Sequence, residues 1–395
     1  MIIRRTVLES LLNEINDPEV KILLGPRQVG KTTVLHEIEK YSKSKGYGTA
    51  FFDLEQPDIL AQFNKKDAQI IDILKKSGNI IFIDEFQYLQ NASKIFKAIY
   101  DLKENIKVFC SGSSSLEIHK HLKESLAGRR FLFNIHPFTL AEIRSMLKNF
   151  PLDHYLVYGG MPALIHTDNT ERKQQILSEL LHSYILKDVK SLVKEENIRA
   201  FNHLLYLLAE RQGSTISIHS LATQIGLSSK GTNRYLDILE GTYVNYRIYS
   251  YSNNLGNELK KSCKTYLYDL GMRNILLKDF SDITERADKG ILYESYVFLK
   301  LKFLLKPNME INFWRTKDGS EVDFILTVNR KPIPIEVKSS LKNLDVPSGL
   351  KLFLKRYPRT QKAYVVNQTI SKTITSNNCN IHFIKFEDFE NLTSF

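Results

Sequence analysis

The sequence from Gly25 to Thr32 reads Gly-Pro-Arg-Gln-Val-Gly-Lys-Thr, which fits the pattern G-x-x-x-x-G-K-T. The apolar run Val20–Leu24 leads directly into it, and a helical pattern from Lys31 to about Glu39 follows. The two glycines let the backbone curl so that successive N–H groups point inward, and the start of the helix adds positive potential. The stretch therefore predicts a loop that binds nucleotide phosphates, with Lys31 at the β- and γ-phosphates and the Thr32 hydroxyl at Mg²⁺.

We expect the whole loop and the first helical turn to contact the nucleotide. The predicted residues are Gly25, Pro26, Arg27, Gln28, Val29, Gly30, Lys31, Thr32 and Thr33. A chance glycine-rich turn is the alternative, and a second motif downstream argues against it.

That second motif is Ile80–Glu85, in which four apolar residues precede Asp84 and Glu85. A buried strand would carry the two acids to its C-terminal end, where open parallel sheets bind ligands. We expect Asp84 to hold Mg²⁺ through water, and Glu85 to orient and deprotonate the attacking water.

A further strand, Lys107–Cys110, runs into Ser111-Gly112-Ser113. Either Ser111 or Ser113 would contact the γ-phosphate or the attacking water from between the two motifs. A simple turn that caps a helix over 116–126 is an equally good interpretation. The alternation of strands and helices over the first 150 residues predicts a parallel sheet covered by helices.

Arg129 and Arg130 follow Gly128, directly before an apolar strand that begins at Phe131. Because arginine is planar and always charged, either side chain suits the γ-phosphate of a neighbouring subunit. A solvated basic corner is the alternative, with about equal weight.

These motifs together resemble the AAA+ superfamily of ATPases, in the prokaryotic branch of archaeal-type ATPases related to STAND and Orc/Cdc6-like proteins. The resemblance implies ATP and Mg²⁺ as cofactors, and homo-oligomers in which Arg129 or Arg130 serves as an arginine finger. It also implies that Pro162, in the Gly-Gly-Met-Pro stretch that starts at Gly159, packs on the adenine ring.

The middle of the chain reads as helical from Pro151 to about Gln212, which suggests a lid or bridge. Two short helical patterns separated by Gly226 then predict a helix-turn-helix, with residues 243–249 as a wing. In the second helix Lys230, Asn233 and Arg234 would face outward toward phosphates or bases. A winged helix that serves only as a packing module is nearly as well supported.

In the last third, Asp323 lies on one predicted strand, and Glu336 and Lys338 lie on the next, joined to it by a turn at 329–331. Strand alternation places Glu336 and Lys338 on one face and two apolar residues on the other. With Glu294 from a preceding helix, the carboxylates Glu294, Asp323 and Glu336 would bind Mg²⁺. Lys338 would orient or deprotonate water and offset charge on a pentavalent phosphate.

The four residues resemble the E…D…E-x-K signature of the PD-(D/E)xK restriction-endonuclease-like fold, although Val322 rather than proline precedes Asp323. The whole chain then resembles an architecture that joins an AAA+ ATPase, a winged helix and a nuclease-like domain of poorly defined role. A salt-bridged hairpin, or a nuclease fold without turnover, is the alternative.

The composition of the chain indicates its class of partner and its compartment. The chain has 395 residues and a formal net charge of +11. Residues 291–395 contain 16 Lys or Arg against 10 Asp or Glu, which favours a polyanion partner, nucleic acid and DNA above all. Three scattered cysteines suit a reducing compartment, so we expect a cytoplasmic protein without a membrane span.

The sequence therefore predicts an α/β protein in four parts: an AAA+ P-loop domain (1–150), a helical lid (151–212), a winged helix-turn-helix (213–253) and an α/β nuclease-like domain (254–395). We expect an ATP-driven switch that acts on nucleic acid, with a metal-dependent phosphodiesterase as a further activity of the last part. The alternative is a signalling or scaffold ATPase whose partner is a protein.

Overall fold

The N-terminal part is built on five parallel strands in the order β2-β3-β4-β1-β5. They are β1 (Val20–Leu24), β2 (Thr49–Asp53), β3 (Ile80–Asp84), β4 (Lys107–Gly112) and β5 (Arg130–Asn134). The computed structural model describes residues 3–102, 106–112, 126–184, 198–252, 262–376, 378–392 and 395. Within these, the sheet confirms the α/β prediction and has the fold of a P-loop AAA+ domain.

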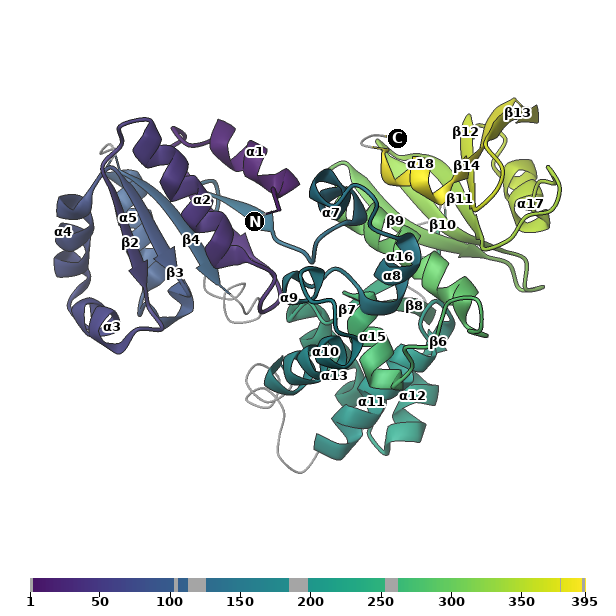
Figure 1. Ribbon diagram of the computed structural model, residues 1–395, viewed down its shortest axis with the longest axis horizontal. Helices are drawn as coiled ribbons and strands as arrows, with labels where there is room; N and C mark the ends of the chain where they lie inside the picture. Colours follow the sequence, from purple (N-terminus) through teal and green to yellow (C-terminus); the bar gives the residue numbers. More distant parts are fainter. Residues whose placement is uncertain are drawn as a thin grey trace.

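Helices cover both faces of this sheet (Figure 1). They are α1 (Thr6–Asn13), α2 (Lys31–Ser44), α3 (Pro57–Phe63), α4 (Asp67–Ser77) and α5 (Ala92–Asp101), with a short 3₁₀ turn η1 (Phe86–Tyr88) after β3. Strand β3 is buried along its whole length, and its side chains alternate between two apolar clusters, with Phe82 in one and Ile83 in the other. This explains why the run reads as continuously apolar rather than alternating.

The middle part is mostly helical. It contains α7 (Leu140–Met146), α8 (Leu152–Tyr158), α9 (Pro162–Ile165), α10 (Thr170–Tyr184), α11 (Ile198–Glu210), α12 (Ile218–Ile225), α13 (Ser229–Gly241) and α15 (Leu270–Leu277). Helices α12 and α13 lie where the helix-turn-helix is expected, with Gly226 between them in the left-handed region at φ 71° and Ser228 capping α13.

A three-stranded antiparallel sheet accompanies this helix pair, in the order β6 (Thr215–Ser217), β8 (Ser262–Leu267), β7 (Asn245–Tyr249). The expected boundary between 253 and 254 cuts this sheet, because β8 and then α15 return to the middle part. That boundary is expected where the residue pattern of the sequence changes, and such a change does not reveal which strands pair.

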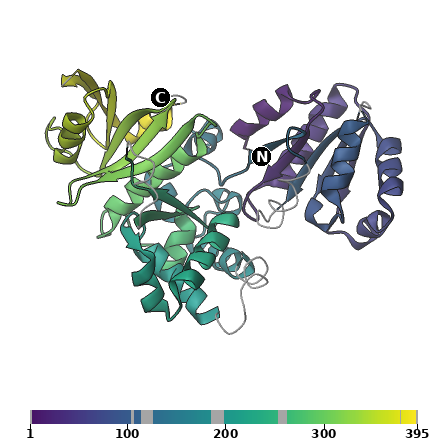
Figure 2. The same ribbon diagram turned by 180° about the vertical axis from the view of Figure 1, so that it is seen from behind.

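The C-terminal part is a six-stranded mixed sheet, β13-β14-β12-β11-β10-β9 (Figure 2). Its strands are β9 (Met309–Arg315), β10 (Glu321–Val328), β11 (Lys331–Lys338), β12 (Lys362–Asn367), β13 (Lys372–Ser376) and β14 (Cys379–Lys385). Its helices are α16 (Lys289–Phe303), α17 (Ser348–Arg356) and α18 (Phe386–Glu390). The predicted hairpin is β10–β11, whose turn residues Asn329 and Arg330 both have positive φ, as a type I′ turn requires.

No helix in the described ranges is both long and apolar enough to cross a membrane. Cys110, Cys263 and Cys379 are buried free thiols. The helix expected over 116–126 lies outside the described residues, apart from Leu126.

Candidate nucleotide site and carboxylate cluster

The phosphate loop leaves β1 through a position that admits only glycine. A Cβ on Gly25 would lie 2.1 Å from the backbone oxygen of Ile135. Further along, Gln28 and Gly30 have φ of 59° and 93°, so the loop curls back on itself before α2 begins. The Lys31 ammonium donates to the carbonyls of Gly25 (3.1 Å) and Pro26 (2.8 Å), so this cation is folded over the mouth of the loop.

Asp84 is the centre of the polar network beside the loop. The Thr32 hydroxyl donates to its Oδ2 at 2.6 Å, the Ser111 hydroxyl donates to its Oδ1, and the Glu85 N–H donates to Oδ1 at 3.2 Å. Asp84 is buried. The two expected Mg²⁺ ligands, Thr32 and Asp84, are thus within hydrogen-bond distance, and two hard oxygen donors side by side fit this cation.

Strand order explains why Ser111 joins this network. Strand β4 lies between β3 and β1, so Ser111 lies beside Leu23 of β1 and follows Cys110, which pairs with Ile83. Of the two serines considered from the sequence, Ser111 therefore lies between the phosphate loop that follows β1 and the acidic pair at the end of β3. Ser113 lies outside the described residues.

Glu85 follows Asp84 in the left-handed conformation, at φ 51°, which non-glycine residues rarely adopt. Burial raises the pKa of its carboxyl, against the effects of a hydrogen bond from Gln87 and the charge of Lys31. A partly buried carboxylate with a raised pKa, close to the phosphate loop, is suited to act as a general base.

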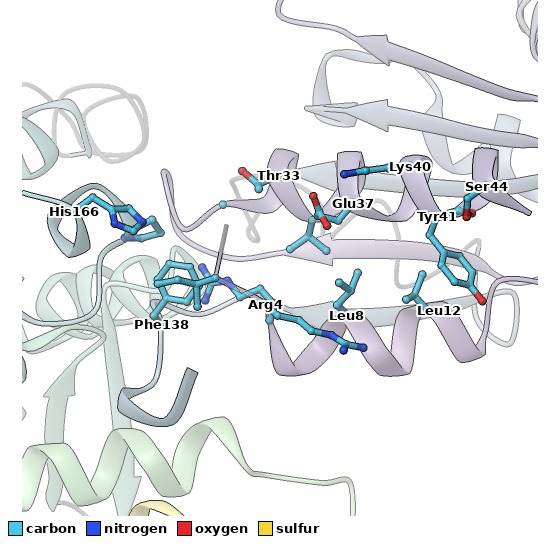
Figure 3. Close-up of a pocket in the computed structure, with 15 residues that line it drawn as sticks. Arg4, Leu8, Leu12, Thr33, Glu37, Lys40, Tyr41, Ser44, Phe138 and His166 are labelled. Atoms are coloured by element: carbon cyan, nitrogen blue, oxygen red, sulfur yellow. The ribbon is translucent and has the colours of Figure 1, made fainter. Parts of the chain in front are cut away.

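A cavity of about 560 Å³ lies beside the loop, between α1 and α2 (Figure 3). Gly30, Thr33 and Val34 line it from the loop side, and the figure shows Phe138 and His166 at one end. Pro162 also lines it, so the residue expected at the adenine ring is next to the phosphate loop. The stretch that carries Pro162 is fixed by backbone bonds, because Phe138 N–H donates to the Gly160 oxygen and Gly160 N–H donates to Asp269, both at 2.8 Å.

Arg5 is a residue of this site that sequence reasoning missed. Its guanidinium donates to the Val29 oxygen inside the loop and to the His136 oxygen at 2.9 Å, and it lies 3.6 Å from the Phe138 ring centroid. Burial lowers the pKa of Arg5 to about 10, although Glu142 at 3.6 Å opposes this. No local pattern marks Arg5, since an arginine near a chain start is ordinary.

The two arginines considered as fingers lie at the end of the sheet opposite the phosphate loop, where β1 and β5 begin. Arg130 pairs with Val20 at the start of β1, whereas the loop follows its end about 15 Å away. Arg129 forms an exposed ion pair with Asp101 at 2.9 Å. Neither arginine can reach the phosphates of its own chain, so any contact would be with a neighbour's.

In the C-terminal part, Asp323, Glu336 and Lys338 come together as expected. The Val337 N–H donates to Asp323 Oδ2 at 2.8 Å, and the Lys338 ammonium lies 2.7 Å from Glu336 Oε1. Ile335 and Val337 pack in the same apolar cluster, whereas Val365, the strand neighbour of Glu336, packs in another, as the predicted alternation requires. Burial, with the Asp323 charge as a second cause, raises the pKa of Glu336.

Glu294 is held by other partners. Its Oε1 accepts from the Tyr266 hydroxyl at 2.6 Å and lies 3.2 Å from the Lys264 ammonium, which also contacts Glu321. No three His, Cys, Asp or Glu side chains in the described ranges are grouped so that they could hold a metal ion. The expected set of three carboxylates therefore does not form, because the cation Lys264 from β8 takes up Glu294.

Asp323 and Glu336 alone still fit a cation. Glu336 Oε2 is buried and has no hydrogen-bond partner among the described residues, and a bound Mg²⁺ would satisfy it. No pattern in the sequence marks Lys264, because its pairing with Glu294 depends on β8 lying beside α16 in the folded chain.

The outward face of α13 is less basic than expected. Lys230 and Arg234 are exposed, but Asp237 and Glu240 follow on the same helix. Arg247 of β7 pairs with both acids, at 2.7 Å to Asp237 and at 2.8 Å through its Nε to Glu240. The helix itself therefore carries no net charge.

Comparison with protein families divides the chain in three. Residues 17–144 match a family described as AAA domain. This part of the chain has an AAA-type ATPase fold. Residues 149–282 and 289–386 match two families described as domains of unknown function, DUF8612 and DUF4143. The first ends after α15, in agreement with the sheet that crosses the boundary expected at 253.

Relatives that match this chain over most of its length occur in bacteria and archaea. An uncharacterized protein of Mycobacterium tuberculosis is 26% identical over 341 residues, which cover 86% of this chain and 74% of that protein. Uncharacterized protein MJ1544 of Methanocaldococcus jannaschii is 26% identical over 400 residues, covering 95% and 86%. The AAA-type part and both following parts thus recur together.

Among solved structures, AMPPCP-bound DnaA from Aquifex aeolicus is 17% identical, with a TM-score of 0.31 over 59% of this chain and 86% of that one. The Thermotoga maritima RuvB branch migration motor is 15% identical, with a TM-score of 0.33 over 62% and 90%. At these scores neither likeness carries an argument about what this chain does.

Proposed function

We propose that the protein binds and hydrolyses ATP at the phosphate loop and uses the nucleotide as a switch. The observation that supports this best is the position of Asp84, whose carboxylate accepts from the Thr32 and Ser111 hydroxyls at once. Thr32 and Asp84 would hold Mg²⁺, which supplies positive charge to the β- and γ-phosphates when bound.

The remaining residues then have separate roles. Lys31 would leave the loop carbonyls and contact the β- and γ-phosphates, since its hydrogen bonds to Gly25 and Pro26 show that it reaches across the loop. Glu85 would take the proton of the attacking water, and Ser111 would orient it. Pro162 would cover the adenine ring in the cavity beside α2.

Equilibrium binding of labelled ATP with Mg²⁺ tests this proposal. Lys31→Ala should weaken binding at least tenfold, or about 1.4 kcal/mol. Lys43→Ala is the matched control, because Lys43 is on the same helix but is 60% exposed and paired with Glu39. Equal affinity of wild type and Lys31→Ala, or no binding at all, would exclude an ATPase.

We further propose that nucleic acid is the partner. The net charge of +11 favours a polyanion, and α12, α13 and the β6-β8-β7 sheet would together form a winged helix. We assign this module to residues 213–267, after an AAA+ domain (1–150) and a lid, and before a nuclease-like domain that starts at α16. Arg129 or Arg130 would complete the ATP site of a neighbouring copy.

The competing proposal is a scaffold ATPase with a protein partner. Filter binding of oligonucleotides at several salt concentrations separates the two, because phosphate contacts make affinity fall steeply with salt. A steep slope supports nucleic acid, and a flat one supports the scaffold.

One observation favours a second activity, metal-dependent phosphodiester cleavage. Asp323 and Glu336 could share a cation, since no residue in the described part of the chain bonds the buried Oε2 of Glu336, and Lys338 is beside them. The test is cleavage of DNA or RNA with Mg²⁺ or Mn²⁺ that is lost in Lys338→Ala. If wild type cleaves no polynucleotide, the domain only binds.

A further inference from the structure

Helix α17 presents a strongly basic surface that differs from the rest of the chain. Its inner side packs on the C-terminal sheet through the buried residues Leu350, Phe353 and Leu354. Its outer side is exposed and carries Lys351, Lys355 and Arg356, with no acid anywhere in the helix. Both views place it at the outer end of the molecule, away from the five-stranded sheet (Figures 1 and 2).

Two further cations flank the helix in the sequence, Lys342 before it and Arg359 after it, and both are exposed. We call the five residues Lys342, Lys351, Lys355, Arg356 and Arg359 the basic face. In the part of the chain that the structure describes, none of them forms an ion pair with an acid. Their charge is therefore available to a partner, and five cations gather here against two, Lys230 and Arg234, on the exposed side of α13.

The basic face lies on the same side of the sheet as Glu336. Ile335 and Val337 belong to the apolar cluster that contains residues of α16, so Glu336 between them faces the opposite side. Val365, the parallel neighbour of Glu336, packs in the cluster that contains Leu350 and Phe353 of α17. Glu336 and Lys338 thus point to the side of the sheet that α17 covers.

Helix α17 also sits directly against the strand that carries Asp323. A Cβ on Gly349 would lie 1.9 Å from the backbone oxygen of Glu321, so the helix begins in van der Waals contact with β10. The contact fixes the basic face relative to the hairpin of Asp323, Glu336 and Lys338.

We propose that the basic face, rather than α13, is the main surface on which this protein docks a polynucleotide through its phosphates. The inference rests on the proposed nucleic-acid partner and names the surface that binds it. Lys351 and Lys355 are one helical turn apart, so their ammonium groups can contact neighbouring phosphates of one strand. Contacts to phosphates alone give no sequence preference.

The test is fluorescence anisotropy of a labelled oligonucleotide with the full-length protein over a series of salt concentrations. The variant Lys355→Gln with Arg356→Gln removes two charges from the basic face. The matched variant Lys230→Gln with Arg234→Gln removes two exposed charges from α13. Circular dichroism, thermal denaturation and ATP binding confirm that both variants are folded.

The α17 variant should lose at least tenfold in affinity at low salt, and its slope of log K against log salt should shrink by about 1.8, or 0.9 for each lost phosphate contact. The α13 variant should stay within twofold of wild type. An unchanged slope in the α17 variant, or a larger loss in the α13 variant, overturns this inference alone. Wild-type protein without any salt-dependent binding overturns the nucleic-acid partner as well.

Discussion

The carboxylate of Glu390 accepts a hydrogen bond from the backbone N–H of Ala141 at 2.7 Å, although 249 residues separate the two in the chain. Glu390 also accepts from the Tyr296 hydroxyl of α16. Glu142, which follows Ala141 in α7, accepts a hydrogen bond from the Thr6 N–H at 2.8 Å and lies 3.6 Å from the Arg5 guanidinium. Two neighbouring contacts on α7 thus connect the C-terminal part with the segment that holds the phosphate loop.

Replacement of Glu390 by glutamine should destabilise the protein markedly. Glu390 is 2% exposed, and its carboxylate accepts hydrogen bonds from α7 and α16 and lies 3.9 Å from the Lys300 ammonium. A hydrogen bond to a charged group is worth about 1.5–3 kcal/mol. We expect a lowered thermal midpoint for Glu390→Gln. Glu387→Gln is the control on the same helix, because the Glu387 side chain is 70% exposed and surface changes stay within about 0.5 kcal/mol. Equal midpoints for the two variants would show that the contact with Ala141 contributes little.

The nucleotide site is the part that the sequence predicts best. Strand β3 and its terminal Asp84 follow from a short apolar run, because burial on both faces of a parallel sheet leaves a local signature. The choice between Ser111 and Ser113 needed the strand order, which places β4 beside β1. Local patterns do not contain that order.

The carboxylate cluster shows the opposite case. The hairpin with Asp323 and Glu336 could be predicted from alternation and a turn signal. The ion pair of Glu294 with Lys264 could not be predicted, because Lys264 comes from a strand in a different sheet. One buried lysine among many solvated ones leaves no trace in the sequence, and its burial depends on tertiary contacts alone.

Alanine at Gly159 should be far more harmful than alanine at Gly226. Both residues have nearly the same backbone, with φ of 74° and 71°. A Cβ at Gly159 would lie 2.2 Å from the Asp269 carboxylate, whereas no described atom lies within 4 Å of a Cβ at Gly226. Gly226→Ala should cost about 1 kcal/mol for the left-handed backbone, and Gly159→Ala about 1–3 kcal/mol more for the clash.

Thermal denaturation measures both glycine variants. The Gly159 variant should also bind ATP more weakly, since Gly159 and Gly160 position the stretch that leads to Pro162 in the cavity. Similar losses of stability at the two positions would mean that Asp269 moves aside without cost.

The Asp269 carboxyl should make stability depend on pH between about 4 and 6. Burial raises the pKa of Asp269 from 3.8 to about 6, against hydrogen bonds from Gly160 and Met272. The folded state therefore keeps its proton at a pH where the unfolded chain has lost it. This contribution is complete below pH 3.8 and is lost as pH rises through 6, at about 1.4 kcal/mol for each unit of pKa difference.

The measurement compares wild type with Asp269→Asn, which keeps the shape of the side chain but does not titrate. The denaturation midpoint of wild type relative to the variant should fall from pH 4 to 6 and then stay constant. A relative midpoint that rises over this range would mean that Asp269 is stabilised as the carboxylate.

The pH dependence of ATP hydrolysis should reveal the surroundings of Glu85. As a base Glu85 must be ionised, so kcat should fall on acidification through its pKa, which burial holds above the usual 4.5. Gln87 donates a hydrogen bond to Glu85 Oε2 and favours the ionised form. Gln87→Leu removes this bond, so the pKa of Glu85 should rise and the acid limb of the kcat profile should move to higher pH.

Tyr88→Phe is the control for that measurement, because Tyr88 is in the same 3₁₀ turn and is 43% exposed. Its acid limb should coincide with that of wild type. If the limb of Gln87→Leu stays in place while kcat drops, Gln87 positions the attacking water and does not tune the base. A limb that moves to lower pH would show that another group takes the proton, because loss of a donor to Glu85 can only make its carboxylate harder to form.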